Sequence, residues 1–248
     1  MAIPDTRPPR IAVLIDADNA SASHAPAVFE EIAKHGEANV RRIYGDFSGT
    51  RLKKWEEHLQ PLAIHPSQVF NYTTGKNAAD ITLVIDAMDL MHTGALETFC
   101  LVSSDSDFTR LAQRLRENGK TVIGFGERKA PEAFRNACNR FIYFDILDRA
   151  GDQGDEETPK PQAPAKQPPS KAVPMIAKAV DELADDDGWV NLGTLGQRLL
   201  SRHPDFDPRE YGCSKLSELI KKSGAFALDK QGGTSLQVRR TAKRAAVK

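Results

Sequence analysis

The chain has 248 residues, of which 40% are hydrophobic and 27% are charged, and its formal net charge at pH 7 is zero. This composition is typical of a globular protein with a real core, in one or two domains. No apolar run approaches the roughly 18 residues needed to cross a membrane. The polar, proline-rich start lacks the apolar core of a signal peptide, so we expect a cytoplasmic location and no membrane partner. The three isolated cysteines disfavour zinc ribbons and disulfide frameworks.

Apolar strands and amphipathic helices alternate through the first 150 residues. This alternation is typical of βαβ units and predicts an α/β fold, with a mainly parallel sheet flanked by helices. In chain order, we expect strands at 11–16, 40–44, 62–65, 98–102, 121–125 and 141–144, separated by helices at 25–35, 52–59, 78–91, 108–116 and 132–137.

The apolar pattern stops between Gly151 and Ser170, where five prolines stand among charged and small residues. Such a segment buries too little apolar surface to order itself, so it predicts an extended linker between two folded units. Beyond it, three helices and a β-hairpin indicate a small winged-helix-like α+β domain. We expect these helices at 173–183, 192–200 and 214–222, a short helical turn at 208–211, and strands at 226–228 and 235–238 around Gly232-Gly233.

A first group of acidic and amide side chains follows the first expected strand. Asp16 closes the run Ile11–Ile15, and Asp18 and Asn19 come directly after it. Ligands of open α/β sheets bind at the carboxyl ends of the strands, which makes Asp16 a candidate metal ligand and Asn19 a candidate contact to water or substrate. The structural alternative is a turn, because Asp and Asn favour turns and helix caps.

A second group opens the helix expected at 78–91. Asp80 lies in its first turn, and Asn77 stands three residues earlier, so capping alone explains this spacing. Lys76 and Asn77 are nevertheless candidates for substrate binding, although a loop lysine is usually only solvated. Farther along the helix, we interpret Asp86 as a partly buried acid with a structural partner.

A third group, Ser103 to Phe108, follows the strand expected at 98–102. Asp105 is expected at the same sheet edge as Asp16, with Asp107 beside it and Ser104 as a candidate contact to a phosphate or to metal-bound water. A helix cap by Ser106 or Asp107 explains one residue of this run but not the others. Carboxylates gathered at one edge repel one another unless a divalent cation neutralises them, so the pattern predicts a Mg²⁺ or Mn²⁺ site and phosphate chemistry.

These three motifs, in this order, resemble the NYN domain over about residues 10–148. The resemblance implies a PIN-like fold and metal-dependent hydrolysis of RNA phosphodiesters. It places the acidic site at Asp16, Asp80 and Asp105, with Asp107 as a fourth acid. Arg51, with Lys53 and Lys54, is a candidate to steer the RNA backbone.

The segment from Phe206 to Leu216 resembles the signature of the OST-HTH (LOTUS) domain. This resemblance implies RNA binding, to single-stranded or structured RNA, with Lys215 as a candidate contact. A purely structural interpretation is that the apolar residues of the segment pack and the lysines form a solvated face. The expected domain boundaries are 9–150 for the NYN domain, 151–170 for the linker, 171–240 for the OST-HTH domain and 241–248 for a basic tail.

Two other interpretations remain open at this point. One is a non-catalytic module that binds RNA or a protein. The other is a phosphatase of the haloacid dehalogenase type, because Asp16-Ala17-Asp18 fits the start of its nucleophile loop, although Ala20 stands where Thr or Val is expected. The class also permits a homodimer. The sequence does not distinguish RNA from DNA, or endonuclease from exonuclease action.

Overall fold

The computed structural model describes residues 7–70, 77–151, 166–230 and 235–241, without the side chains of 149–151. Its internal contacts divide the chain into two compact units, Met1–Lys160 and Pro161–Lys248. Lys76, most of the expected linker and the basic tail beyond Thr241 lie outside the described residues, as does the expected Gly232-Gly233 turn. Within those residues, no helix combines the length and the apolar character that a membrane crossing requires.

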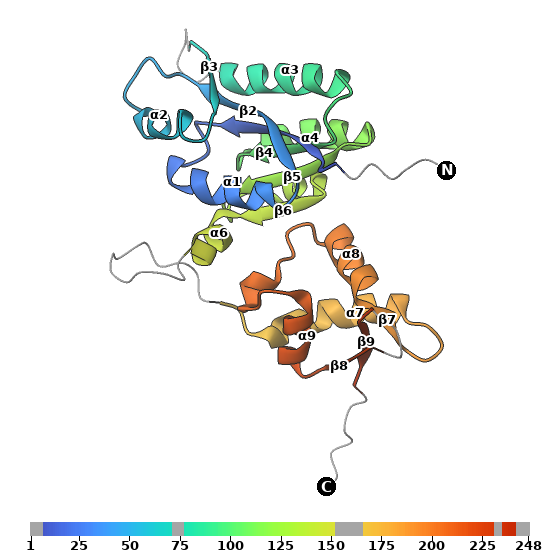
Figure 1. The fold of residues 1–248 in the computed structure, drawn as a ribbon. Coiled ribbons are helices and arrows are strands. Elements are labelled where there is room, and N and C mark those ends of the chain that lie inside the picture. Colours follow the sequence, from blue (N-terminus) through green and yellow to red (C-terminus); the bar gives the residue numbers. More distant parts are fainter. Residues whose placement is uncertain (1–6, 71–76, 152–165, 231–234, 242–248) are drawn as a thin grey trace, which may run out of the picture. The chain divides into compact units, whose positions relative to one another are not determined.

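The first unit is built on a six-stranded sheet in the order β3-β2-β1-β4-β5-β6 (Figure 1). Every neighbouring pair is parallel, which confirms the predicted α/β fold. Since β1 pairs with both β2 and β4, the strand order reverses between β1 and β4, and such a switch point is where open α/β sheets bind ligands. The strands are β1 Arg10–Asp16, β2 Glu37–Gly45, β3 His65–Gln68, β4 Thr98–Val102, β5 Thr121–Gly126 and β6 Arg140–Tyr143.

Helices cover both faces of this sheet (Figure 1). In β1, Ile11, Val13 and Ile15 pack into the core beneath one helical layer, whereas Ala12 and Leu14 pack into the opposite core. A strand buried on both faces is apolar throughout, which explains why the sequence identified it. One layer contains α1 Ala25–Ala33, α2 Lys53–Leu59 and α6 Phe144–Gly151, and the other contains α3 Ala78–His92, α4 Thr109–Glu117 and α5 Glu132–Ala137.

The strand expected at 62–65 is wrong, because β3 begins only at His65. The backbone N–H groups of Leu62 and Ala63 donate to the carbonyls of His58 and Gln60, both at 3.1 Å, so the chain is still leaving α2. Ala63 has a φ of 50°, which turns the backbone away from an extended path. Helix α6 was missed altogether, because only eight residues follow the last strand before the proline-rich stretch.

The second unit is a small α+β domain, as predicted. Its three helices enclose a core that includes the buried Ile176, Leu195 and Leu219. A three-stranded antiparallel sheet in the order β7-β9-β8 closes it, and its first strand, of two residues, was not predicted. The elements are α7 Val173–Leu183, β7 Val190–Asn191, α8 Leu192–Arg202, α9 Leu216–Ser223, β8 Phe226–Asp229 and β9 Gln237–Arg240, with single 3-10 turns at Pro169–Ala172 and Pro208–Tyr211.

Candidate functional site

Asp16 is the last residue of β1, and its side chain is buried. Its Oδ1 accepts hydrogen bonds from the backbone N–H groups of Asp18 at 3.0 Å and Asn19 at 3.3 Å. Its Oδ2 accepts from Asn19 Nδ2 at 2.9 Å and from Ser103 Oγ at 2.7 Å. Burial raises the pKa of Asp16, and the four hydrogen bonds, led by that from Ser103, offset only part of the rise. Asp16 therefore both closes the loop after β1 and places a buried carboxyl at the switch point.

Ser103 is a site residue that the sequence analysis did not single out. Its hydroxyl donates to Asp16 and accepts from the backbone N–H of Asp105 at 3.0 Å. Ile15 of β1 is the register partner of Val102 of β4, so Asp16 and Ser103 follow side by side on neighbouring strands. The sequence signal was a serine directly after an apolar strand, but it identifies a bridge only once β1 and β4 are known to be neighbours.

The loop after β4 brings Asp105 and Asp107 to the start of α3. Asp105 Oδ1 accepts from the backbone N–H of Asp107 at 2.9 Å, so Asp105 makes the cap that was expected from Ser106 or Asp107. Asp107 Oδ2 accepts from Asn77 Nδ2 at 3.0 Å. Asn77 stands at the N-cap position of α3 but makes no capping hydrogen bond with its side chain. Its amide is used instead to hold an aspartate of another loop.

Asp80, in the first turn of α3, differs from its neighbours because its carboxyl makes no hydrogen bond or ion pair with any described residue. Burial, and then the negative charges of Asp16, Asp105, Asp18 and Asp107, raise its pKa to about 6. Acids from two other segments, the loops after β1 and β4, therefore act on one carboxyl. Across residues 7–70, 77–148, 166–230 and 235–241, however, no three His, Cys, Asp or Glu side chains are arranged so that they could hold one metal ion.

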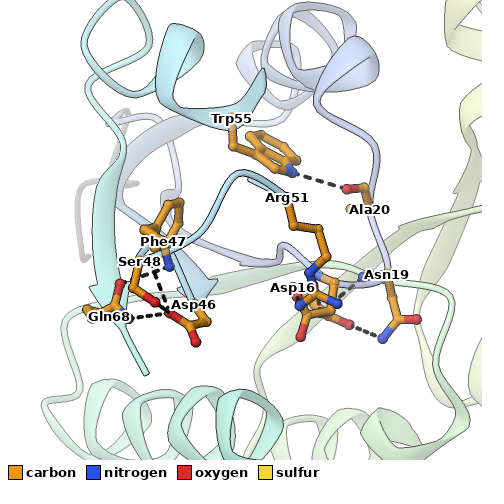
Figure 2. A network of polar contacts seen from close by, with 10 residues as sticks. Asp16, Asn19, Ala20, Asp46, Phe47, Ser48, Arg51, Trp55 and Gln68 are labelled. Carbon is orange, nitrogen blue, oxygen red and sulfur yellow. Dashed lines mark hydrogen bonds and ion pairs between the residues drawn. The ribbon is translucent and has the colours of Figure 1, made fainter. Parts of the chain in front are cut away.

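Arg51 brings a positive charge to this acidic edge. Arg51 belongs to the loop between β2 and α2 (Figure 2), and its guanidinium forms an ion pair with Asp18. The loop is held at one end by Asp46, whose Oδ1 accepts from Ser48 N at 3.0 Å and from Gln68 Nε2 at 2.8 Å. Figure 2 also shows Trp55 Nε1, which donates to the carbonyl of Ala20 at 3.1 Å and joins α2 to the loop after β1.

Two glycines let the loops approach these strand ends closely. A Cβ on Gly126, the last residue of β5, would lie 2.7 Å from the Ser103 carbonyl oxygen and 3.0 Å from Ser104 Oγ. A Cβ on Gly45, the last residue of β2, would lie 2.7 Å from Leu52 Cδ1 and 3.0 Å from Ala17 Cβ. The strands that carry Asp16 and Ser103 are thus flanked on both sides by strands that end in glycine.

Other candidates from the sequence lie in different settings. Ser104 is buried, and its Oγ accepts from the backbone N–H of Glu127 at 2.8 Å, so its hydroxyl holds the loop and is turned away from solvent. Asp86 has the structural partners expected of it, since its Oδ2 accepts from Arg42 at 2.7 Å and from Tyr44 at 2.9 Å. Lys215 is exposed on the second unit, just before α9.

The side chains at the switch point suit a hard divalent cation by their chemistry. They offer carboxylate oxygens, which Mg²⁺ and Mn²⁺ prefer, and no thiolate or imidazole. Asp80 has no partner among the described residues, and the hydrogen bonds that Asp105 accepts from Ser106 and Asp107 both reach its Oδ1. Asp16, in contrast, already accepts four hydrogen bonds. The donor set therefore fits such an ion, and its ligands would have to draw closer to hold one.

Two solved structures among those that the chain resembles carry titles that assign no function. A protein of unknown function from Vibrio parahaemolyticus is 18% identical, with a TM-score of 0.48, over 57% of this chain and 96% of that one. An uncharacterized protein from Nitrosomonas europaea is 31% identical, with a TM-score of 0.29, over 39% of this chain and 97% of that one. No curated protein matches the chain.

Family models cover both units. Residues 10–147 match the NYN domain, a PIN-like nuclease family, and residues 164–238 match the OST-HTH/LOTUS domain, a class that binds RNA. The order of these two matches along the chain is the order that the sequence motifs predicted. With more than half of its residues in the first match, and with the acidic switch point described above, the chain belongs to the NYN family and carries an OST-HTH/LOTUS domain after it.

Proposed function

We propose that this chain is a divalent-metal-dependent ribonuclease that hydrolyses RNA phosphodiesters at the β1–β4 switch point. The observation that carries the proposal is the state of Asp80, a carboxyl without a partner among the described residues whose pKa is raised to about 6 by burial and by four other aspartates. A fold gains nothing from such crowding, whereas a bound cation would relieve it. Perturbed groups of this kind in a strand-end crevice are typical of functional sites.

Asp16, Asp80, Asp105 and Asp107 are the residues that would hold Mg²⁺ or Mn²⁺. When bound, such an ion supplies an activated water and offsets the negative charge on the phosphate. The protein's own contribution is positioning: Ser103 fixes Asp16 relative to the loop of Asp105. Asn19 and Asn77, which the sequence offered as substrate contacts, instead orient Asp16 and Asp107 through their amides.

Arg51 is the residue of the first unit best placed to contact the RNA backbone. Its guanidinium is largely exposed and already lies at the acidic edge, paired with Asp18. A guanidinium binds phosphate as readily as carboxylate, because both present two oxygens to its planar fork. We therefore assign Arg51 to holding a phosphate of the substrate. Lys76 stays a prediction, and Ser104, being buried, is removed from the substrate-binding set.

A non-catalytic RNA-binding module is the alternative, and two observations favour it. Asp16 accepts four hydrogen bonds, and no three acids among the described residues stand ready to hold one ion. A phosphatase of the haloacid dehalogenase type is disfavoured by the NYN match and by the same four hydrogen bonds, because a nucleophilic Asp16 needs a free carboxylate oxygen. Cytoplasmic location, a homodimer and the domain boundaries stay predictions.

The decisive experiment compares three forms of the full chain on labelled RNA and DNA with Mn²⁺, Mg²⁺ or EDTA. The forms are the wild type, Asp80→Asn and the control Asp89→Asn, which removes the same charge from an exposed position of the same helix. We expect metal-dependent cleavage of RNA by the wild type and the control only. If the wild type shows no metal-stimulated activity on any substrate, the non-catalytic binding module is the better interpretation. If Asp80→Asn is as active as the wild type, the reaction does not depend on Asp80.

A further inference from the structure

Two surfaces of the second unit that carry positive side chains differ in how far those charges are neutralised by neighbouring acids. The first surface is α9, the third helix of the unit, which holds the place of a recognition helix in a helix-turn-helix domain. Glu218 on this helix pairs with Lys222 at 2.7 Å and accepts from Ser214 N at 2.7 Å and from its hydroxyl at 3.0 Å. The hydrogen bond from Lys222 is the main reason that the pKa of Glu218 falls to about 2.

The ionised Glu218 makes α9 a poor place for an RNA phosphate. The carboxylate already accepts the hydrogen bonds that Ser214 donates beside the start of the helix, and it neutralises one of the lysines near the end. A phosphate approaching Lys215 would meet this fixed negative charge within the first turn of α9. The lysine that the sequence favoured for RNA contact therefore lies on the less suitable of the two surfaces.

The second surface is an open groove of about 300 Å³ between α7 and α8. Its floor is apolar, with Ala179 and Leu199 buried and Met175 half-buried. Its rim carries Lys178, Arg202 and His203, all exposed. Glu182 pairs with Arg202 at 2.8 Å, so part of the positive charge at that end is neutralised. Lys178, in contrast, makes no ion pair with any described residue.

We propose that the α7–α8 groove binds one nucleotide of single-stranded RNA, with the base on the apolar floor and the adjoining phosphate at Lys178. The volume lies at the lower end of the ~300–1,000 Å³ typical of ligand pockets, which suits one nucleotide and not a folded partner. An apolar floor beside cationic and planar side chains matches a nucleotide, which joins an aromatic face to an anion. This inference rests on RNA being the substrate of the proposed function.

The test measures the affinity of the full chain for a labelled single-stranded RNA of about 15 nucleotides in EDTA, where no metal-dependent cleavage occurs, over a series of salt concentrations. We expect Lys178→Ala to weaken binding about fivefold and to reduce the slope of log affinity against log salt by about 0.7, the value for one phosphate contact on a single strand. Met175→Ser should weaken binding by a similar factor without changing that slope, since it alters only the apolar floor.

Lys215→Ala and Lys221→Ala are the matched controls, because each removes one exposed lysine from the α9 side of the same unit. Both should bind RNA as the wild type does. The groove assignment is overturned if Lys178→Ala leaves affinity and salt slope unchanged, or if Lys215→Ala causes the larger loss. Circular dichroism of each variant excludes unfolding as the cause of a loss.

The same proteins separate this inference from the proposed function. Asp80→Asn should abolish cleavage while leaving the affinity for RNA in EDTA unaltered within about twofold. Lys178→Ala should weaken binding yet still cleave when the RNA is supplied at saturating concentration. A wild type that binds RNA through the groove but never cleaves it would refute the ribonuclease and preserve the groove. A wild type that cleaves RNA, with an affinity that Lys178→Ala leaves unchanged, would preserve the ribonuclease and refute the groove.

Discussion

The acidic edge of the first unit and the surface of the second unit differ in whether charged side chains have oppositely charged neighbours. In the second unit, ion pairs neutralise several charges locally, as in Arg209–Asp207 at 2.7 Å and Arg240–Asp181 at 2.6 Å. At the β1–β4 switch point, aspartates instead face aspartates, and Asp80 has no partner among the described residues. Because a fold alone gains from local neutralisation, the crowding of aspartates at the switch point supports the proposed cation site.

The largest expected effect is on catalysis. Replacing Asp80 with Asn keeps the size of the side chain and removes its charge, and we expect the rate of metal-dependent RNA cleavage to fall by about 10²–10³-fold. Single-turnover cleavage with Mn²⁺ measures this directly. A comparable loss in Asp89→Asn, at an exposed position of the same helix, would mean that only the net charge of the region matters. That result would refute a specific site at Asp80.

Ser103→Ala tests whether the buried serine organises the acids. The change removes the donor to Asp16 Oδ2 and the acceptor for the Asp105 N–H. We expect the affinity for Mn²⁺ to fall about 10- to 100-fold, as is typical when a residue that orients a metal ligand is lost. Titration of activity against Mn²⁺ measures it, and full recovery of the maximal rate at high Mn²⁺ would distinguish positioning from chemistry. An unchanged Mn²⁺ dependence contradicts the role.

Arg51→Ala tests the one cation that is paired with the acidic edge in the part of the chain that the structure describes. We expect KM for RNA to rise about tenfold with a smaller change in kcat, because a charge-assisted contact to phosphate is lost. Steady-state kinetics on a short RNA measures both constants. The control is Arg114→Ala, an exposed arginine of α4 that also makes an ion pair, with Glu117 at 3.6 Å. A loss confined to kcat would assign Arg51 to the reacting groups instead of to binding.

The smallest expected effect concerns stability without metal. The pKa of Asp80 is about 6 in the folded chain against 3.8 as its ordinary value, so the folded state binds this proton more tightly. The free energy of unfolding therefore falls as pH rises from about 4 to about 6, and the penalty is complete above that window. In EDTA at pH 7, we expect Asp80→Asn to be about 1 kcal/mol more stable, a figure reduced from the full shift because solvent screens this partly exposed carboxyl.

Thermal unfolding with and without Mn²⁺ at pH 5 and pH 7 checks this prediction. Mn²⁺ should raise the Tm of the wild type and not that of Asp80→Asn, because an ion that binds only the folded state stabilises it. Equal Tm values for the two proteins in EDTA at pH 7 would mean that the crowding of carboxylates at Asp80 costs no stability. The comparison between the two regions would then lose its energetic basis.

The sequence predicted the fold well wherever a strand is buried on both faces of the sheet. Strand β1 is apolar between Arg10 and Asp16, β4 is apolar after Thr98, and both were placed within a residue. Local backbone geometry was less readable: the φ of 50° at Ala63 delays β3, and no sequence pattern required it. Helix α6 escaped notice because its apolar positions are too few to establish a helical period.

The candidate acids were found from their positions at strand ends, but the contacts that organise them were not. Ser103 reaches Asp16 only because β4 lies beside β1, and Arg51 reaches Asp18 across 33 residues of chain. Asn77 was expected to cap its own helix and instead binds Asp107, 30 residues away. Strand order and loop path determine these pairings, and residue spacing does not encode either of them.

Gly45 and Gly126 limit which substitutions the backbone around this site can accommodate. Each ends a strand beside the central pair, and an added methyl group would meet the Ser103 carbonyl oxygen at Gly126 and the Leu52 side chain at Gly45. A substitution at Gly126 would shift the backbone at Ser103, beside Asp16, without replacing any carboxylate. Mutant libraries that vary the polar site residues but keep these two glycines would therefore preserve the backbone around the site. Replacing each glycine with alanine would measure how much displacement of that backbone the activity tolerates.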